Sequence, residues 1–519
     1  MHGKDLPVNR RAVLRLVVVA GAIAYIAWTG LKPKPDANDA QLAAPIATDA
    51  NAFSLGTLHF SACQLPQKRS GATTSAFCAP FSVPENRADP NGRKLDLRLA
   101  LLKSDAPATD RDIVVYLAGG PGQSAIDTWP QMAAALAPLR KHRHILLLDQ
   151  RGTGGSNALT CKDQDASSAS GSRLDPDEVR ERTRECLRAV EKRADPRYYT
   201  TTVAAEDLEA VRQALGAPSF DLIGVSYGTR LAQQYLMHHP EAVRSLVLDS
   251  VVPNELVLGE DFAQNLEAAL KAQFSSCTRT PACAKAFGDP YASLIALRDR
   301  LRAQPKTWDY RDPVTYAPAH LRLDDGRLAS LVRLFAYTPE TAALLPLSIS
   351  EGLKGDLSPL AGQEKLLTDD LADLSGNAMQ LSVVCSEDAE LLKPRPQDAD
   401  TVLGTRLIEL LQAACEVWPH GARPADFHAG LKTSVPTLIL EGELDPVTPP
   451  RYGRQVLEGL TAGRLLVARG QGHNVIGRGC IPKLVGDFVD KRAPKSLDAK
   501  CIDELGPTPA FLDFNGASP

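Results

Sequence analysis

The chain has 519 residues, of which 44% are hydrophobic and 23% charged, a composition typical of a globular protein with two or three domains or one large domain with an insertion. Its net charge of −4 provides no basic field for nucleic acid. No repeat of solenoid length is present in the sequence, which excludes that class.

Residues 1–34 form a predicted export segment. Four Lys and Arg residues within the first 15 precede an apolar run at residues 16–31. Counted from residue 12, the run has about 20 residues and spans roughly 30 Å as a helix, enough to cross a bilayer. The positive N-terminal side predicts that the body is exported to the periplasmic or extracellular face. A cleaved signal peptide and an uncleaved anchor both fit, and we favour the anchor because no obvious cleavage site follows the run. Residues 35–50, rich in Pro, Ala and Asp, are expected to be a linker.

The ten cysteines agree with export. None forms a C-x-x-C pair and none lies near a His at zinc-ligand spacing, so we expect no metal site and no cofactor. The cysteines fall into near-neighbour couples, which an oxidising compartment would convert into structural disulfides, with buried free thiols as the alternative. The simplest pairing is Cys63–Cys78, Cys161–Cys186, Cys277–Cys283, Cys385–Cys415 and Cys480–Cys501.

The predicted elements begin with short β-like runs between residues 55 and 102, which indicate an antiparallel edge leading into a sheet. Runs that are apolar throughout come next and alternate with helical patterns, as expected for strands buried on both faces of a parallel sheet. Residues 51–252 are therefore expected to form the first part of an α/β core. The apolar runs lie at residues 113–118, 144–149, 220–223 and 245–249.

The alternation of apolar runs and helical patterns stops between residues 253 and 434. Helical patterns punctuated by Pro and Gly predict a mainly helical insertion there, which we interpret as a lid. The alternation resumes after this insertion, so residues 435–519 are expected to complete the core. The helical patterns lie at residues 256–274, 291–302, 328–337 and 341–353, the later strands at 436–441 and 464–468, and a final helix at 481–491.

The motif Gly224-Val-Ser-Tyr-Gly228 directly follows a predicted buried strand and has the G-x-S-x-G pattern of a nucleophile elbow. A serine at a sharp strand-to-helix turn has a strained backbone, so small residues are needed two positions before and after it. Its hydroxyl is then held above the sheet, and the next N–H points to where an oxyanion would form. Ser226 is therefore the candidate nucleophile, with a simple Gly-rich turn as the alternative.

A serine nucleophile needs a base, and the base needs an orienting acid. Asp445 follows the strand predicted at 436–441, and His473 follows the next strand in a Gly-rich loop. All three residues stand just past the carboxyl ends of predicted strands, where open parallel sheets form their sites. Asp249 and Glu443 are the rival acids, and Asp249 is expected to cap a strand end instead.

Two backbone N–H groups are expected to stabilise the oxyanion. Tyr227 directly follows the nucleophile and supplies one of them. The other is expected from the Gly119-Gly-Pro-Gly122 loop, where the absence of side chains lets the backbone approach a substrate. We assign this second donor to Gly120, with Gly119 as the alternative.

Five motifs together resemble one known family. They are Ala118-Gly-Gly-Pro-Gly122, Asp149-Gln-Arg-Gly-Thr-Gly-Gly-Ser156, Gly224-Val-Ser-Tyr-Gly228, Gly442-Glu-Leu-Asp-Pro-Val-Thr-Pro449 and Gly472-His473. Over roughly residues 53–501 the chain resembles the proline iminopeptidase and tripeptidyl aminopeptidase family of α/β-hydrolases. Proline iminopeptidases usually have His and Trp where this chain has Ala118 and Tyr227. This difference favours the exported tripeptidyl-aminopeptidase branch.

The resemblance implies an α/β-hydrolase fold, with a mostly parallel doubly wound sheet and a large helical lid. It also implies a serine exopeptidase that acts near the free N-terminus of peptide substrates and releases tripeptides or single residues. Such an enzyme needs an anion for the substrate ammonium. Glu387 and Asp388, beside Cys385, are the candidates, with a solvated helix start as the alternative reading.

Three further expectations complete the prediction. Arg151 is expected to brace the Gly-rich loop through an ion pair rather than to contact substrate. Contact with a membrane is expected through the N-terminal segment only. An esterase on the same triad and a non-catalytic envelope binding protein stay open as alternative functions.

Overall fold

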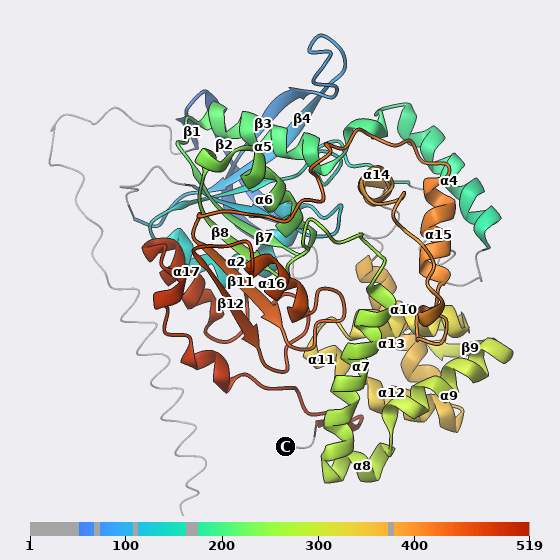
Figure 1. The fold of residues 1–519 in the computed structure, drawn as a ribbon. Helices are drawn as coiled ribbons and strands as arrows, with labels where there is room; N and C mark the ends of the chain where they lie inside the picture. The colour runs from blue at the N-terminus through green and yellow to red at the C-terminus, as the bar shows by residue number, and fades with distance from the viewer. Residues whose placement is uncertain (1–50, 67–72, 107–112, 162–174, 372–377, 518–519) are drawn as a thin grey trace, which may run out of the picture. The chain divides into compact units, whose positions relative to one another are not determined.

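A ten-stranded sheet forms the frame of the computed structural model, which describes residues 51–66, 73–106, 113–161, 175–371 and 378–517 (Figure 1). Residues 51–519 form one compact unit. In spatial order the strands are β1 (Ala52–Leu55), β2 (Leu58–Pro66), β3 (Thr73–Pro84), β4 (Lys94–Leu102), β6 (His144–Leu148), β5 (Ile113–Leu117), β7 (Phe220–Val225), β8 (Val243–Asp249), β11 (Thr437–Gly442) and β12 (Gly463–Ala468).

The sheet combines an antiparallel edge with a parallel centre. Strands β1 to β4 pair antiparallel, and β4 also pairs antiparallel with β6. From β6 to β12 every neighbouring pair is parallel. Strands β5, β7 and β11 are buried along their whole length, as expected for central strands of a parallel sheet whose sequences are mainly apolar. The predicted parallel sheet with an antiparallel edge is confirmed.

Helices cover both faces of the sheet, because alternate side chains of its central strands point in opposite directions. On β5, Val114 belongs to the apolar cluster that contains α2 and α17, whereas Val115 belongs to the cluster that contains α4, α5, α6 and α16. This is the doubly wound arrangement. The helices are α2 (Ala125–Arg140), α4 (Pro176–Glu191), α5 (Thr201–Leu215), α6 (Tyr227–His238), α16 (Pro450–Leu457) and α17 (Ile481–Lys491).

The insertion between β8 and β11 builds a third apolar cluster of its own, from α7, α9, α10, α12 and α13. Its elements are α7 (Phe262–Arg279), α8 (Pro281–Phe287), α9 (Pro290–Ala303), β9 (Lys306–Arg311), β10 (Pro318–Leu323), α10 (Asp325–Phe335), α11 (Pro339–Ala342), α12 (Leu345–Lys354), α13 (Ser358–Leu371), α14 (Ala378–Glu387) and α15 (Arg406–Cys415).

Two details of this insertion differ from the sequence-based expectation. The helix predicted over residues 256–274 begins only at Phe262, because Gly259 adopts a φ of 104°, which a helix does not tolerate. The hairpin of β9 and β10 was not predicted. Its signal is the alternation in β9, where Trp308 and Tyr310 are half-buried and their neighbours are exposed.

The chain ends with short elements that lead away from the sheet. After α17 come two 3₁₀ turns and a two-stranded hairpin, and the backbone N–H of Phe511 in this hairpin donates to Ala343 O in the insertion. These elements are η4 (Pro494–Ser496), η5 (Lys500–Glu504), β13 (Phe511–Asp513) and β14 (Gly516–Ala517).

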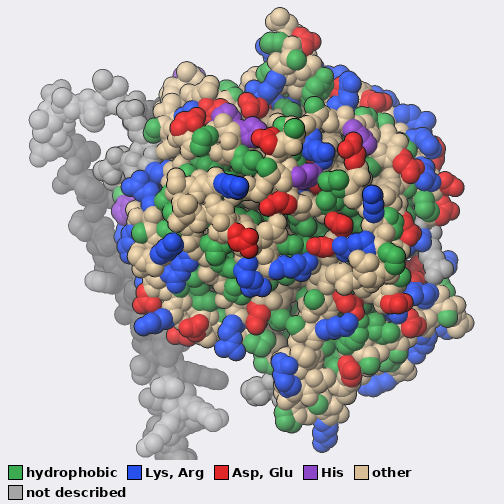
Figure 2. All heavy atoms as spheres, in the orientation of Figure 1, with side chains coloured by type: hydrophobic (Ala, Val, Ile, Leu, Met, Phe, Trp, Pro, Cys, Tyr) green, Lys and Arg blue, Asp and Glu red, His purple; other side chains and the backbone are tan. Residues whose placement is uncertain are grey.

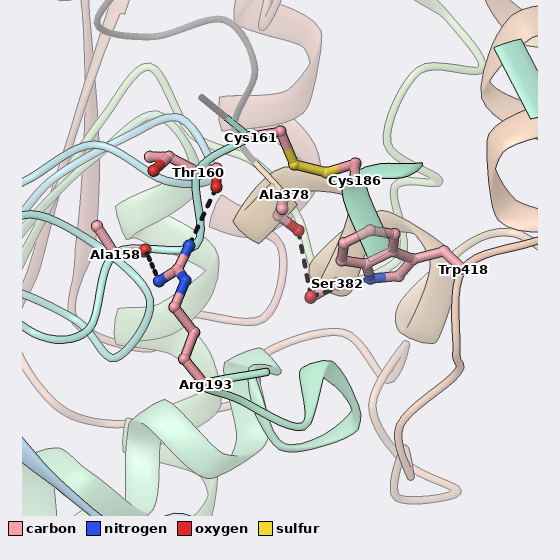
Figure 3. Close-up of a disulfide and its surroundings, with 8 residues drawn as sticks. All are labelled: Ala158, Thr160, Cys161, Cys186, Arg193, Ala378, Ser382 and Trp418. Atoms are coloured by element: carbon pink, nitrogen blue, oxygen red, sulfur yellow. Dashed lines mark hydrogen bonds between the residues drawn. A yellow bond between two sulfur atoms is a disulfide. The ribbon is translucent and has the colours of Figure 1, made fainter. Parts of the chain in front are cut away.

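All five predicted disulfides are present, and the residues that the structure describes contain no free cysteine. Figure 3 shows Cys161–Cys186, which attaches α4 to the segment that follows the Gly-rich loop. In the same view Arg193 donates to Ala158 O and Thr160 O and holds that segment. The near-neighbour pairing predicted from the sequence is confirmed.

The described surface carries charges of both signs (Figure 2). On the face shown in Figure 2, basic and acidic side chains are interspersed with apolar ones. Among the described residues, no helix combines the length and apolarity needed to cross a membrane. The predicted export segment and linker, residues 1–50, lie outside the described residues.

Candidate active site

Ser226 lies at the turn between β7 and α6, with φ 54° and ψ −124°. This positive φ is unusual for a residue with a side chain and marks a strained backbone. Glycine at 224 and 228 makes the turn possible, because a Cβ at Gly224 would lie 2.6 Å from Gly228 O and one at Gly228 would meet Leu117 O. The Ser226 N–H donates to Asp249 O at 2.9 Å, which ties the turn to the neighbouring strand.

His473 lies within hydrogen-bond distance of both Ser226 and Asp445. Its Nε2 is 3.0 Å from Ser226 Oγ, and its Nδ1 is 2.7 Å from Asp445 Oδ2. The His473 and Asp445 side chains are buried, so little water competes for these bonds. The structure thus brings together the three residues that the sequence singled out as nucleophile, base and acid.

Asp445 is held in place by the turn that follows it. The N–H groups of Val447 and Thr448 donate to its Oδ1 at 2.7 and 2.8 Å, and the Thr448 hydroxyl donates to its Oδ2 at 3.0 Å. Burial raises the pKa of Asp445, but the His473 ring and these N–H donors outweigh burial and hold the pKa below its usual value. Asp445 is therefore ionised and oriented toward His473.

Of the two predicted oxyanion donors, Tyr227 directly follows the nucleophile, and Gly120 belongs to a glycine loop that runs close to it. The Tyr227 N–H is the first of α6 and has no acceptor within that helix. The glycine loop also runs close to the nucleophile, since a Cβ on Gly119 would lie only 3.1 Å from Ser226 Cβ. Gly120 has φ 111°, a conformation that favours glycine. A side chain at position 119 would press on Ser226, whereas one at position 120 would collide with the backbone of Gly122 and Gln123.

The two rival acids hold the histidine loop by its backbone instead of orienting the imidazole. Asp249 accepts from the N–H groups of Val475 and Ile476 at 2.9 and 3.0 Å, and burial raises its pKa to about 6. Glu443 accepts from the Gly470 N–H at 2.8 Å. Both carboxylates therefore fix the loop on either side of its catalytic candidate.

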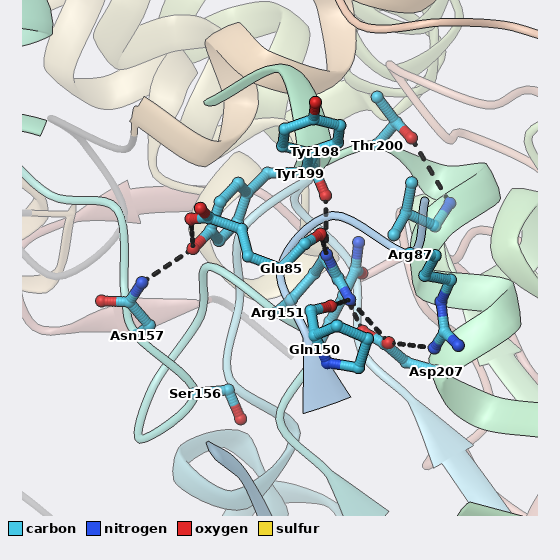
Figure 4. A network of polar contacts seen from close by, with 12 residues as sticks. Glu85, Arg87, Gln150, Arg151, Ser156, Asn157, Tyr198, Tyr199, Thr200 and Asp207 are labelled. Atoms are coloured by element: carbon cyan, nitrogen blue, oxygen red, sulfur yellow. Dashed lines mark hydrogen bonds and ion pairs between the residues drawn. The ribbon is translucent and has the colours of Figure 1, made fainter. Parts of the chain in front are cut away.

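Arg151 braces the Gly-rich loop, as expected (Figure 4). Its guanidinium is fully buried and bonds both carboxylate oxygens of Asp207, at 2.6 and 2.7 Å. It also donates to Glu85 O and Tyr198 O, and Arg87 bonds Asp207 from the other side. A guanidinium with so many internal partners is not available to a substrate.

Glu387 and Asp388, the candidates for binding the substrate ammonium, have different surroundings. Each is only 1% exposed. Asp388 is paired with Arg230 at 2.8 Å and with His428 at 2.9 Å. Glu387 accepts from Thr201 N–H at 2.7 Å and from its hydroxyl at 3.0 Å, and Arg230 Nη1 is 4.0 Å away. Burial raises the pKa of Glu387 to about 8.

Glu387 is also connected to the residue after the nucleophile. The Thr201 hydroxyl lies 2.6 Å from the Tyr227 hydroxyl, to which Gln150 donates at 3.2 Å. The last residue of α14 is thereby linked through Thr201 to the first residue of α6. Neither Glu387 nor Asp388 is open to solvent in this structure, so an ammonium could reach Glu387 only after a local movement of α14 or of the Thr201 segment.

The site contains one contact from the insertion that the sequence did not indicate. The His473 N–H donates to Tyr337 O at 2.7 Å, and the two rings meet edge-on with centroids 5.1 Å apart. Gly472 makes this approach possible, because a Cβ there would collide with Tyr337 O. The separation of 136 residues between Tyr337 and His473 hides this contact from any local motif.

Comparisons with known proteins agree with this arrangement. A family profile described as the alpha/beta hydrolase fold matches residues 112–478. The tripeptidyl aminopeptidase of Streptomyces coelicolor is 25% identical over 470 residues, which cover 83% of this chain and 84% of that protein. The serine protease Hip1 of Mycobacterium tuberculosis is 25% identical over 473 residues, covering 82% of this chain and 87% of that protein. The carboxylesterase B of Mycobacterium tuberculosis is 29% identical over 269 residues, covering 47% of this chain and 50% of that protein. The predicted resemblance to tripeptidyl aminopeptidases is confirmed.

Proposed function

Because the chain belongs to the alpha/beta hydrolase fold family, we propose that Ser226, His473 and Asp445 hydrolyse peptide bonds near the free N-terminus of peptides. The chain is a serine hydrolase, and the names of its two long relatives support peptidase activity. The observation that carries the proposal is the continuous hydrogen-bonded path from Ser226 Oγ through the His473 ring to Asp445.

The reaction begins with proton transfer. His473 Nε2 accepts the Ser226 hydroxyl proton while Oγ attacks the carbonyl carbon of the scissile bond. Asp445 accepts a hydrogen bond from the Nδ1–H group, which keeps the free electron pair on Nε2 facing the serine, and its negative charge stabilises the imidazolium that forms. The N–H groups of Tyr227 and Gly120 bind the oxyanion of the tetrahedral intermediate.

The intermediate then collapses to products. His473 donates its proton to the leaving amine, and the N-terminal fragment stays bound to Ser226 as an ester. A water molecule, deprotonated by His473, attacks this ester and releases the fragment as a free acid. The released fragment is a tripeptide or a single residue, as the resemblance to the tripeptidyl aminopeptidase family implies.

For the substrate ammonium we propose Glu387 alone. The pairing of Asp388 with Arg230 and His428 leaves it no free charge to offer. Glu387 has no cation closer than the 4.0 Å of Arg230 among the residues described, and its raised pKa means that an incoming ammonium would stabilise its ionised form. In this proposal residues 253–434 are the lid that brings this carboxyl group to the site.

We also propose that the protein acts outside the cytoplasm. Five disulfides within one chain are typical of oxidising compartments. The basic and apolar sequence of residues 1–34 would serve as the export segment and hold the enzyme at the membrane.

The first test compares substrates with free and blocked N-termini. We expect wild-type enzyme to release anilines from tripeptidyl or aminoacyl anilides, and to lose this activity when the substrate amine is acetylated. The Ser226→Ala variant is expected to fold normally and to lose at least about 10⁴-fold in kcat, since the nucleophile is gone. Circular dichroism checks the fold, and labelling by a serine-directed phosphonate reports the nucleophile.

Each other outcome identifies a different function. Equal turnover of blocked and free substrates, with esters preferred, would point to an esterase, the activity named for the relative that matches 47% of this chain. Failure of the wild type to react with the phosphonate would point to a binding protein. Near-normal turnover by Ser226→Ala would contradict the assigned nucleophile.

A further inference from the structure

Arg333, in the last turns of α10, lies close to the catalytic histidine without an acidic partner. Its guanidinium carbon is 4.7 Å from the centre of the Phe262 ring and 5.8 Å from the centre of the Tyr337 ring. The Tyr337 ring in turn meets the His473 ring edge-on. The guanidinium is therefore two ring contacts away from the imidazole.

The charge of Arg333 is not neutralised within the described part of the chain. No described carboxylate lies within 4.0 Å of its nitrogens, and its guanidinium makes no hydrogen bond to a described residue. The nearby Asp261 is already engaged by Arg395 and Arg451, at 2.7 and 3.2 Å. Arg333 is half-buried, so its N–H donors still reach solvent.

Two other arginines of the insertion have acidic partners, unlike Arg333. Arg327, six residues earlier on α10, is buried and paired with Glu364, and Arg302 is paired with Asp325. A guanidinium that is fixed between two rings, with free donors, is preorganised for a planar anion. Guanidinium groups bind carboxylates in a bidentate manner, which suits this geometry.

The position of Arg333 decides which anion it would meet. In the proposed reaction His473 protonates the leaving amine, so the leaving peptide passes along the His473 side of the site. An extended peptide advances about 3.3 Å per residue. Arg333, which is two ring contacts away from His473, therefore lies about as far from His473 as the C-terminus of a leaving peptide of two or three residues.

We propose that Arg333 binds the C-terminal carboxylate of short peptide substrates and so makes the enzyme selective for oligopeptides with a short leaving segment. This inference rests on the proposed peptidase function. The carboxylate would form a charge-assisted, bidentate pair with Arg333, while Tyr337 and Phe262 hold the guanidinium in position. Longer substrates would place their carboxylate beyond Arg333 and lose this pair.

The experiment compares each peptide with its C-terminal amide. The substrates are peptides with a free N-terminus and two or three residues after the cleaved bond, and a peptidyl anilide that has no residue there. We expect wild-type enzyme to show a kcat/KM at least about tenfold higher for the acid than for the amide, as a charge-assisted hydrogen bond gives. The ratio should fall toward one when the leaving segment is lengthened to six residues.

The variants test whether the effect comes from Arg333 itself or from the overall positive charge of the insertion. Arg333→Gln is expected to remove most of the acid-over-amide ratio through a higher KM, with anilide turnover unchanged, and Arg333→Lys to keep part of it. Arg322→Gln removes the same charge from an exposed position on β10 and should keep the full ratio. Equal turnover of acids and amides by the wild type, or an unchanged ratio in Arg333→Gln, would overturn the proposal. Failure of the peptidase function itself would be distinguished by the absence of anilide turnover in the wild type.

Discussion

At the residue scale, Glu387 is the clearest case of burial acting against charge. Its carboxyl group is enclosed, receives two hydrogen bonds from Thr201, and has a pKa raised to about 8 by burial. Below that pH it is mainly neutral in the free enzyme. A substrate ammonium placed beside it would supply the missing counter-charge and favour loss of its proton, so binding and deprotonation would be coupled.

The pH dependence of KM tests this coupling. For substrates with a free N-terminus we expect KM to fall as pH rises from 6 toward 8, because more of the enzyme carries an ionised Glu387. Glu387→Gln is expected to raise KM about tenfold or more and to flatten this profile, since the amide cannot ionise. Steady-state kinetics across that pH range measure both effects.

Two controls keep this prediction specific. Glu390→Gln alters an exposed carboxylate three residues away and should change neither KM nor its profile. The rate of labelling by the serine-directed phosphonate, which carries no amine, should be the same in wild type and Glu387→Gln. An unchanged KM for free-amine substrates in Glu387→Gln would rule out the ammonium assignment.

Local sequence motifs could reveal the site residues that stand at the ends of strands. Ser226, Asp445 and His473 each follow a buried strand, so the fold brings them together once the strands are recognised. Tyr337 and Arg333 could not be found this way. Their proximity to His473 depends on how the insertion packs on the core, and no short pattern in the sequence records that packing.

At the element scale, the segment after Cys501 joins the core, the histidine loop and the insertion. Gly506 O accepts a hydrogen bond of 3.0 Å from the side chain of Gln471, which stands two residues before His473. Gly470 packs so closely on Pro507 that a Cβ on it would collide with the Pro507 backbone. Further along, the Phe511 N–H donates to Ala343 O at 3.0 Å. This tail thus contacts the histidine loop in addition to the Asp249 and Glu443 contacts within the core.

Truncation tests the role of this tail. A chain that ends after Glu504 is expected to keep the core fold, because Cys480–Cys501 is retained, but to lose about three- to tenfold in kcat as the histidine loop loosens. A chain that ends after Asn515 keeps the Gly506 and Phe511 contacts and should retain wild-type kcat. Anilide kinetics and thermal unfolding measure the two effects. Wild-type kcat in the shorter chain would show that the tail does not support the site.

Elements in which apolar residues recur at regular spacing were also predictable, whereas elements in which this pattern is short or interrupted were not. The helix at 481–491 was predicted at its observed bounds, Ile481–Lys491, because its apolar residues recur at helical spacing. The hairpin of β9 and β10 was missed because its strands have only six residues each and stand between helices, so the alternation of inward and exposed residues in each strand is short.

At the scale of the whole molecule, disulfides connect the parts of the chain that carry the site. Cys385–Cys415 joins α14, which ends at Glu387, to α15. Helix α15 lies against α4, where Arg180 pairs with Glu416 at 2.6 Å, and α4 is fixed by Cys161–Cys186. Glu387 is therefore held by two disulfides and the packing of α15 on α4, which together lead from the insertion to the segment after the Gly-rich loop.

This connection predicts that two disulfides of the same insertion differ in their effect on activity. Replacing both Cys385 and Cys415 by Ser opens a loop of 30 residues, which costs about 3 to 4 kcal/mol of stability in the chain-entropy description, and it frees the end of α14. Replacing Cys277 and Cys283 opens a loop of six residues at the junction of α7 and α8, at a cost of about 2 kcal/mol. We expect both variants to unfold at lower temperature, but only the first to raise KM severalfold for free-amine substrates while leaving the rate of phosphonate labelling unchanged. Equal KM values in the two variants would show that this connection does not position Glu387, because loss of stability alone would then account for every effect.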